Sequence, residues 1–246
     1  MAGKSSSRIP EILYEDDSII VCHKPAGMPT ETARAREMDL VSYLKNVRAQ
    51  RGQEPYVGLV TRLDQPVEGL IVCGLTQKAA AALSASQQAG KWTKRYEALV
   101  RGSVPEGTHR LEDYLLRDGR TNTSKVVQKG TKGAKRAALV WECLESGPEA
   151  SRIRVTLETG RHHQIRVQMA HAGYPLLGDR KYGSNVMTAE NRKTAYDLTG
   201  ENGPKANAGG LSAAENRAFP ALCAVFLEFP HPKTGEMVSF HTRPNF

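Results

Sequence analysis

The sequence predicts an α+β fold, with a mixed, largely antiparallel central sheet flanked by helices and loops. Three observations support this class. Short apolar runs bounded by turn residues outnumber the segments with helical spacing. Many neighbouring runs are close enough in sequence to form hairpins, which favours antiparallel pairing over a doubly wound sheet. With 246 residues, of which 39% are hydrophobic, the chain can also bury a sizeable core.

The first elements follow from apolar runs and their end signals. Strands are predicted at 12–15, 18–23 and 69–75, where short apolar segments are bounded by polar or turn-forming residues. The segment Lys24-Pro-Ala-Gly27 ends the second strand, because proline lacks a backbone donor and glycine permits positive φ. Apolar residues at helical spacing predict a helix at 39–51.

The remaining elements continue this alternation of strand and helix signals. An Ala-rich helix is predicted at 77–89, with Thr76 as its N-cap and Gly90 as its stop. A turn-rich link at 174–179 precedes the last part of the chain. Further strands are predicted at 94–100, 137–144, 153–157, 221–229 and 237–240, the last two forming a closing hairpin, and a third helix at 163–172.

We expect one domain over 9–246, preceded by a disordered tail at 1–8. Residues 184–216 are rich in Asn, Gly, Ala and charge and have little apolar periodicity, so they predict a surface insertion.

The net charge of +8 favours a polyanionic partner, with nucleic acid ahead of membrane. The four cysteines are far apart and form no CxxC pair, which is typical of reduced thiols in a cytoplasmic protein. We expect a monomer.

The stretch from Val60 to Leu70 carries the most informative carboxylate. Arg62 and Asp64 are two positions apart, so an extended segment would point both to one side, and Gln-Pro then forms a turn. A carboxylate held in this way suits a nucleophile or a general base. The plainer alternative is an aspartate that starts a tight turn beside an ordinary arginine, and this stretch alone favours that alternative.

Two further segments suit contacts with RNA. In Lys94-Arg-Tyr-Glu-Ala98, Tyr96 is flanked by cations, an arrangement that suits a base stacked on the ring beside held phosphates. The alternative is a half-buried strand tyrosine beside solvated lysines. In Thr159–Arg166, Gly160 permits a turn into a helix whose first N–H groups attract anions. Its cationic and donor groups could equally form a solvated helix face.

A basic run could follow a phosphate backbone, or it could be a solvated hairpin tip; it comprises Lys125, Lys129, Lys132, Lys135 and Arg136. His162, His163 and His171 are one and eight positions apart, whereas zinc helices usually place two histidines at i and i+4. The chain contains neither GxxxxGK nor GxGxxG. We therefore expect no metal and no cofactor.

Taken together and in this order, the segments resemble those of the RluA-type RNA pseudouridine synthases. The resemblance extends from near residue 11 to the C-terminus, except for 184–216. The matching segments are Lys24-Pro-Ala-Gly27, Arg62-Leu-Asp64 with Gly69-Leu70, Lys94-Arg-Tyr96-Glu-Ala98, Gly160-Arg-His-His-Gln-Ile-Arg166, Gly178-Asp179 with Tyr182-Gly183, and Phe229-Pro-His-Pro-Lys-Thr-Gly235.

The resemblance implies an isomerase that converts uridine to pseudouridine in structured tRNA or rRNA, without a cofactor or a metal. It assigns the catalytic roles to Asp64, to Tyr96, which stacks on the target uracil, and to Arg166, which pairs with the catalytic aspartate. The RNA contacts expected from the resemblance and from the basic segments are Arg62, Lys94, Arg161, His163, Gln164, Lys125 and Lys129. No S4-type RNA-binding domain is expected before the first strand.

The chain departs from the family pattern at a few positions. Thr61 and Cys223 stand where the family commonly has histidine, and His162 stands where it has threonine. Val67 and Glu68 replace a Thr-Ser pair, and Glu68 adds negative charge near a loop expected to face RNA. These departures support an alternative, a non-catalytic module that binds or folds structured RNA. A metal-dependent hydrolase built on the three histidines is a third, more distant alternative.

Overall fold

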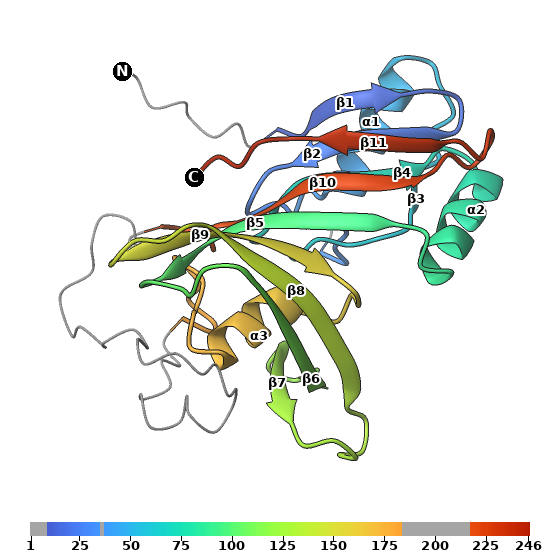
Figure 1. The fold of residues 1–246 in the computed structure, drawn as a ribbon. Coiled ribbons are helices and arrows are strands. Elements are labelled where there is room, and N and C mark those ends of the chain that lie inside the picture. Colours follow the sequence, from blue (N-terminus) through green and yellow to red (C-terminus); the bar gives the residue numbers. More distant parts are fainter. Residues whose placement is uncertain (1–8, 35–36, 184–216) are drawn as a thin grey trace, which may run out of the picture. The chain divides into compact units, whose positions relative to one another are not determined.

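The computed structural model describes residues 9–34, 37–183 and 217–246 (Figure 1). The chain forms two compact units, one from Met1–Arg95 with Cys223–Phe246 and the other from Tyr96–Leu222. The predicted tail at 1–8 and the predicted insertion at 184–216 lie outside the described residues. Within the described residues, no helix is long and apolar enough to cross a membrane.

The first unit is built on a mixed sheet with the strand order β1-β2-β4-β10. Strand β11 pairs with β10, and the short β3 pairs with β4. All of these pairs are antiparallel except β4 with β10, which is parallel. The strands are β1 (Glu11–Glu15), β2 (Ile19–Lys24), β3 (Gly58–Leu59), β4 (Glu68–Gly74), β10 (Leu222–Pro230) and β11 (Met237–His241).

Both faces of this sheet are buried, which explains why β2 and β4 read as continuous apolar runs. On one face, Ile20 of β2 packs with Leu44 of α1 (Leu40–Gln50). On the other, Ile19 packs with Leu83 of α2 (Gln77–Gln88). The side chain of Thr76 accepts a hydrogen bond from the Ala79 N–H at 3.0 Å, which confirms the predicted N-cap.

The second unit contains a sheet with the strand order β5-β9-β8-β6-β7. Its ladders β6–β7, β6–β8 and β8–β9 are antiparallel. Helix α3 (Gln164–His171) packs through Val167 and Ala170 against Leu115 and Ala137 of this sheet (Figure 1). The strands are β5 (Thr93–Arg101), β6 (Thr108–Asp118), β7 (Thr123–Val127), β8 (Lys135–Glu145) and β9 (Ala150–Leu157).

The observed elements confirm the predicted fold class and every predicted strand and helix. Three strands were not expected: β3 has only two residues, and polar side chains occupy some of the inward positions of β6 and β7. Asp113 of β6 is buried, and its Oδ2 accepts a hydrogen bond from Gln168 Nε2 at 2.6 Å. The four cysteines are free thiols, as expected, and all but Cys143 are buried.

Candidate active site

Asp64 lies at the start of a turn whose backbone is fixed on both sides. The Val67 N–H donates to the Asp64 carbonyl at 2.9 Å, which closes the turn predicted from Gln-Pro. The preceding residue, Leu63, is buried, and both of its backbone groups bond to the Thr30 hydroxyl. The half-buried Asp64 is therefore presented by a defined backbone rather than by a mobile loop.

Lys24 lies under this turn with none of its side chain exposed. Its Nζ donates to the carbonyls of Pro25 at 3.0 Å, Met28 at 2.8 Å and Gln65 at 3.2 Å. Three acceptors match the three N–H donors of an ammonium, whereas a neutral amine has only two. Lys24 thereby joins the loop that follows β2 to the turn that carries Asp64.

The charge of Lys24 also acts on Asp64. Burial lowers the pKa of Lys24 to about 7, and attraction to Asp64 is the largest of the effects that oppose this shift. The attraction is reciprocal, so a protonated Lys24 favours the carboxylate form of Asp64. Sequence reasoning used Lys24 as the end of a strand and as part of a segment that carries the resemblance, but it assigned Lys24 no role in the site.

Glu68 does not present its charge to solvent, contrary to the concern raised by the sequence. The residue is 5% exposed, and its carboxylate accepts hydrogen bonds from Asn245 N at 2.8 Å and Asn245 Nδ2 at 2.9 Å. Burial acts to raise the pKa of Glu68, but His23 and Asn245 outweigh it and hold the pKa below its ordinary value. Glu68 therefore holds the C-terminal segment against the sheet.

The predicted cationic contacts of the first unit differ in their exposure. Arg62 is exposed, and its Nη1 lies 4.0 Å from Glu31 Oε2. Lys94 is half-buried, with its Nζ 5.3 Å from the centroid of the Trp92 ring, and burial lowers its pKa. Arg62 is thus the more accessible of the two to a phosphate.

Tyr96 is the first residue of the second unit and lies on β5. It is 9% exposed and shares a buried face with Ala98, while Arg95 on the opposite face is exposed. Buried and exposed side chains therefore alternate along this strand, as in a strand with one buried face. The ring is more buried than the half-buried tyrosine that the sequence alone would suggest.

Arg166 is buried in α3 and forms a two-bond ion pair. Its Nε lies 2.7 Å from Asp179 Oδ2, and its Nη2 lies 2.8 Å from Asp179 Oδ1. Asp179 Oδ1 also accepts hydrogen bonds from the backbone N–H groups of Lys181 and Tyr182. Such a pair fixes the direction of the guanidinium, which carries five donors in all. Sequence reasoning did not foresee this partner, although Asp179 stands in one of the segments that carry the resemblance.

Two residues predicted as RNA contacts lie at the start of α3, His163 as its N-cap and Gln164 as its first residue. Gln164 is buried, with its Oε1 accepting from Thr159 Oγ1 at 2.7 Å and from Arg161 N at 2.9 Å. His163 is buried too, has a positive φ of 55°, and lies with Nδ1 2.7 Å from the Tyr182 hydroxyl. Arg161 itself is exposed and donates from Nε to the Arg136 carbonyl.

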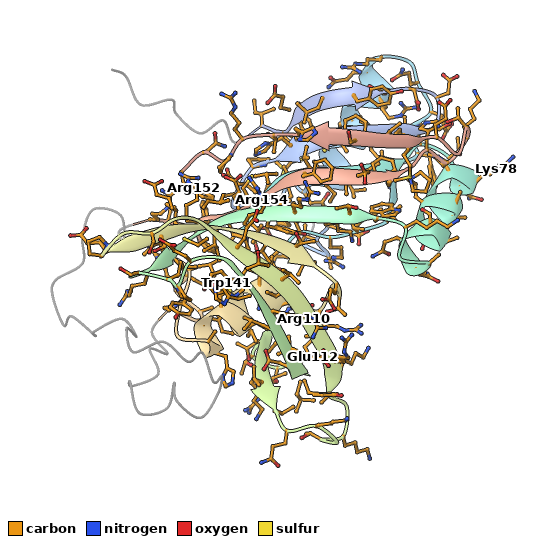
Figure 2. The ribbon with its side chains drawn as sticks, in the orientation of Figure 1. Lys78, Arg110, Glu112, Trp141, Arg152 and Arg154 are labelled. Carbon is orange, nitrogen blue, oxygen red and sulfur yellow. The ribbon has the colours of Figure 1, made fainter. Side chains whose placement is uncertain are left out.

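The basic run covers β7, the start of β8 and the turn between them. Lys125 and Lys129 are exposed. The arginines nearby are matched by glutamates: Arg136 bonds to Glu112, which also pairs with Arg110 (Figure 2). The exposed lysines are therefore the stronger candidates for contacts with phosphate. Among the described residues, no group of three or more His, Cys, Asp or Glu side chains is placed to hold a metal ion.

Comparisons with known proteins show which family the chain resembles. The model of the RNA pseudouridylate synthase family matches residues 18–171. The chain is 34% identical over 231 residues to the ribosomal large subunit pseudouridine synthase D of Vibrio cholerae, covering 94% of this chain and 66% of that protein. For the protein of the same name from Pseudomonas aeruginosa, the identity is 35%, over 92% of this chain and 65% of the relative. The chain thus spans slightly less than two thirds of these relatives.

Solved structures with the same fold include two human proteins. Human RNA Pseudouridylate Synthase Domain Containing 1 matches with a TM-score of 0.71 and 21% identity, over all of this chain and 87% of that one. Human RNA Pseudouridylate Synthase Domain Containing 4 also has a TM-score of 0.71, with 19% identity over 95% of this chain and 88% of that one. The fold, the family match and the sequence identity together show that the chain belongs to the RNA pseudouridylate synthase family.

Proposed function

We propose that the protein isomerises uridine to pseudouridine in structured RNA. In this reaction the bond between uracil N1 and ribose C1′ breaks, and a bond between uracil C5 and C1′ forms. The proton on C5 is lost and N1 gains one, so product and substrate contain the same atoms. Ribosomal RNA of the large subunit is the first substrate to test, because the curated relatives are named for it; tRNA is the second.

The observation that carries this proposal is the hydrogen-bonded turn that bears Asp64, tied through Gln65 to the buried Lys24, whose charge attracts Asp64. In the proposed reaction Asp64 either attacks C1′ or takes a proton from the ribose. Both steps need the ionised form, which the charge of Lys24 favours. A turn whose backbone is held in place also needs little reorganisation when the substrate arrives.

Tyr96 and Arg166 complete the proposed catalytic set. Tyr96 would stack on the target uracil, and its hydroxyl would assist the final removal of a proton. Arg166, which Asp179 holds in one direction, would act on the charge of the catalytic carboxylate. Tyr96→Phe should then slow turnover while RNA binding stays mostly intact, since stacking survives when the hydroxyl is lost.

The proposed RNA contacts lie on exposed cations. A uridine within a stem must leave the stack before a carboxylate can reach its sugar, at a cost of roughly a few kcal/mol. Contacts between exposed cations and phosphates offset that cost. The residues proposed for this role are Arg62, Arg161, Lys125 and Lys129. A monomer in the cytoplasm, where the four thiols stay reduced, is part of the same proposal.

Chemical mapping of pseudouridine in cellular RNA tests the function. A strain without this gene is compared with the same strain carrying either the wild type or Asp64→Asn. We expect at least one uridine to be modified only with the wild-type gene. If Asp64→Asn restored the wild-type pseudouridine map in full, the Asp64 carboxylate would have no catalytic role. An unchanged map in all three strains, together with salt-sensitive RNA binding by the purified protein, would favour the non-catalytic RNA-binding module instead.

A further inference from the structure

His162 lies on the turn before α3, and its ring is held from several directions. The ring stacks on His163, with centroids 3.7 Å apart and planes inclined by 25°. Its Nδ1 lies 2.9 Å from Ser124 Oγ, and its Nε2 lies 3.1 Å from Asn122 Oδ1. Because an amide oxygen only accepts, Nε2 carries the proton and the Ser124 hydroxyl donates to Nδ1.

The support beneath this ring is buried and fixed. His163 bonds through Nδ1 to the Tyr182 hydroxyl, which also accepts from the Ser124 N–H at 2.9 Å. The hairpin β6–β7 therefore meets the turn before α3 through a continuous set of hydrogen bonds. His162, by contrast, is only half-buried. One face of its ring lies against His163 and both nitrogens are bonded, so the opposite face is the part left to solvent.

The surroundings of this exposed face are cationic, yet the ring itself is neutral. Burial, assisted by the positive charges of Arg117, Lys181 and Arg166, lowers the pKa of His162 to about 4. The Lys181 ammonium is held nearby by the Asn122 carbonyl at 2.9 Å. A neutral aromatic surface among cations suits a nucleobase that stacks while its phosphates are attracted.

We propose that the outer face of His162 is a stacking platform for one unpaired base of the RNA, additional to Tyr96. The proposal rests on the proposed function, because it assumes that RNA is the ligand. It assigns a binding role to a position where the chain departs from its family pattern. A base held there would add a contact beyond the target uridine itself, so His162 would contribute to the choice of substrate.

Fluorescence anisotropy with two labelled oligomers tests the platform. One is a short oligouridine, and the other has the same length and phosphates but no bases. His162→Ala removes the surface on which the base stacks. We therefore expect this variant to bind oligouridine about five- to tenfold more weakly and to bind the abasic oligomer like the wild type. His162→Phe should bind oligouridine like the wild type, because it keeps the aromatic face and loses only the bonds to Ser124 and Asn122.

His109 offers a matched control. It too is a half-buried histidine stacked on an aromatic ring, Trp141, with centroids 4.4 Å apart, but its imidazole bonds to the Glu106 carbonyl. We expect His109→Ala to bind both oligomers like the wild type. Circular dichroism of each variant shows whether it is folded.

Several outcomes would overturn the platform. Equal weakening of both oligomers by His162→Ala would indicate a structural effect, and so would a His162→Phe variant as weak as His162→Ala. Unchanged oligouridine binding by His162→Ala would remove the stacking role while leaving the isomerase proposal intact. If the wild type bound neither oligomer, the platform and the RNA-binding part of the proposed function would both be wrong.

Discussion

The side chain of Lys24 connects the charge of Asp64 to the backbone around it. Removing its ammonium leaves the carbonyls of Pro25, Met28 and Gln65 without their donor in a buried place. We expect Lys24→Met to lower the free energy of unfolding by about 2–5 kcal/mol. Lys91→Met is the control, since Lys91 is exposed, and should change it by less than about 0.5 kcal/mol. Urea denaturation of both variants measures the difference, and equal midpoints would show that Lys24 supports nothing.

The stacked histidines predict how stability responds to acid. Burial, assisted by nearby cations, lowers the pKa of His162 from 6.5 to about 4 and that of His163 from 6.5 to about 2. Below pH 6.5 the unfolded chain therefore binds protons that the folded rings do not, so the free energy of unfolding falls as the pH falls. Urea denaturation at a series of pH values measures this dependence. Between pH 6.5 and 4, the free energy of unfolding of His162→Thr should fall less steeply than that of the wild type. Parallel curves would contradict the neutral form of His162.

At the scale of single elements, β4 and β10 approach each other so closely that Gly69 cannot carry a side chain. Its φ is +121°, and a Cβ would lie 2.4 Å from Ala224 N. Gly69→Ala should lower the free energy of unfolding by about 2–4 kcal/mol, because backbone strain and overpacking act together. Gly107 also has positive φ, at +85°, but a Cβ there meets nothing within 4 Å. Gly107→Ala should cost about 1–2 kcal/mol. Thermal denaturation that ranks the two variants equally would show that the close approach is unimportant.

The elements also show what a sequence can and cannot reveal. The strand β2 and the N-cap at Thr76 were predictable, because apolar runs and capping residues leave local patterns. Strand β6 was not, because the inward Asp113 breaks the alternation and becomes acceptable only through its bond to Gln168. The site too combines features that a local sequence pattern reveals with features that it does not. The turn at Asp64 has a local signal, but the bond from Lys24 to Gln65 joins residues 41 positions apart.

For the molecule as a whole, the question is whether RNA responds to the net charge of +8 or to where the charges lie. Lys125 and Lys129 are exposed on the basic run, whereas Lys78 (Figure 2) and Lys91 are exposed elsewhere. Changing either pair to alanine removes two charges. The measurement is the slope of the logarithm of the RNA association constant against the logarithm of the salt concentration. We expect only the change of Lys125 and Lys129 to reduce this slope, by roughly 0.7–0.9 for each lost phosphate contact. Equal slopes for both double variants would mean that net charge alone drives binding.

The tertiary support of the site also bears on the competing functions. Glu68, together with Thr61 and Val67, supported a scaffold that binds RNA without chemistry, because these residues depart from the family pattern near Asp64. The Glu68 carboxylate, however, is buried and bound by Asn245. What remains of the departures, such as Thr61 and Val67, leaves the turn at Asp64 intact. The isomerase proposal therefore agrees better with the observed packing.

The most direct test follows the hydrogen on C5 of uridine. Large-subunit rRNA labelled with tritium at this position is incubated with the purified wild type or with Asp64→Asn, whose fold is checked by denaturation. The wild type should release tritium into water in proportion to the pseudouridine formed, and Asp64→Asn should release none above background. Tritium release by Asp64→Asn at the rate of the wild type would contradict the role given to this carboxylate.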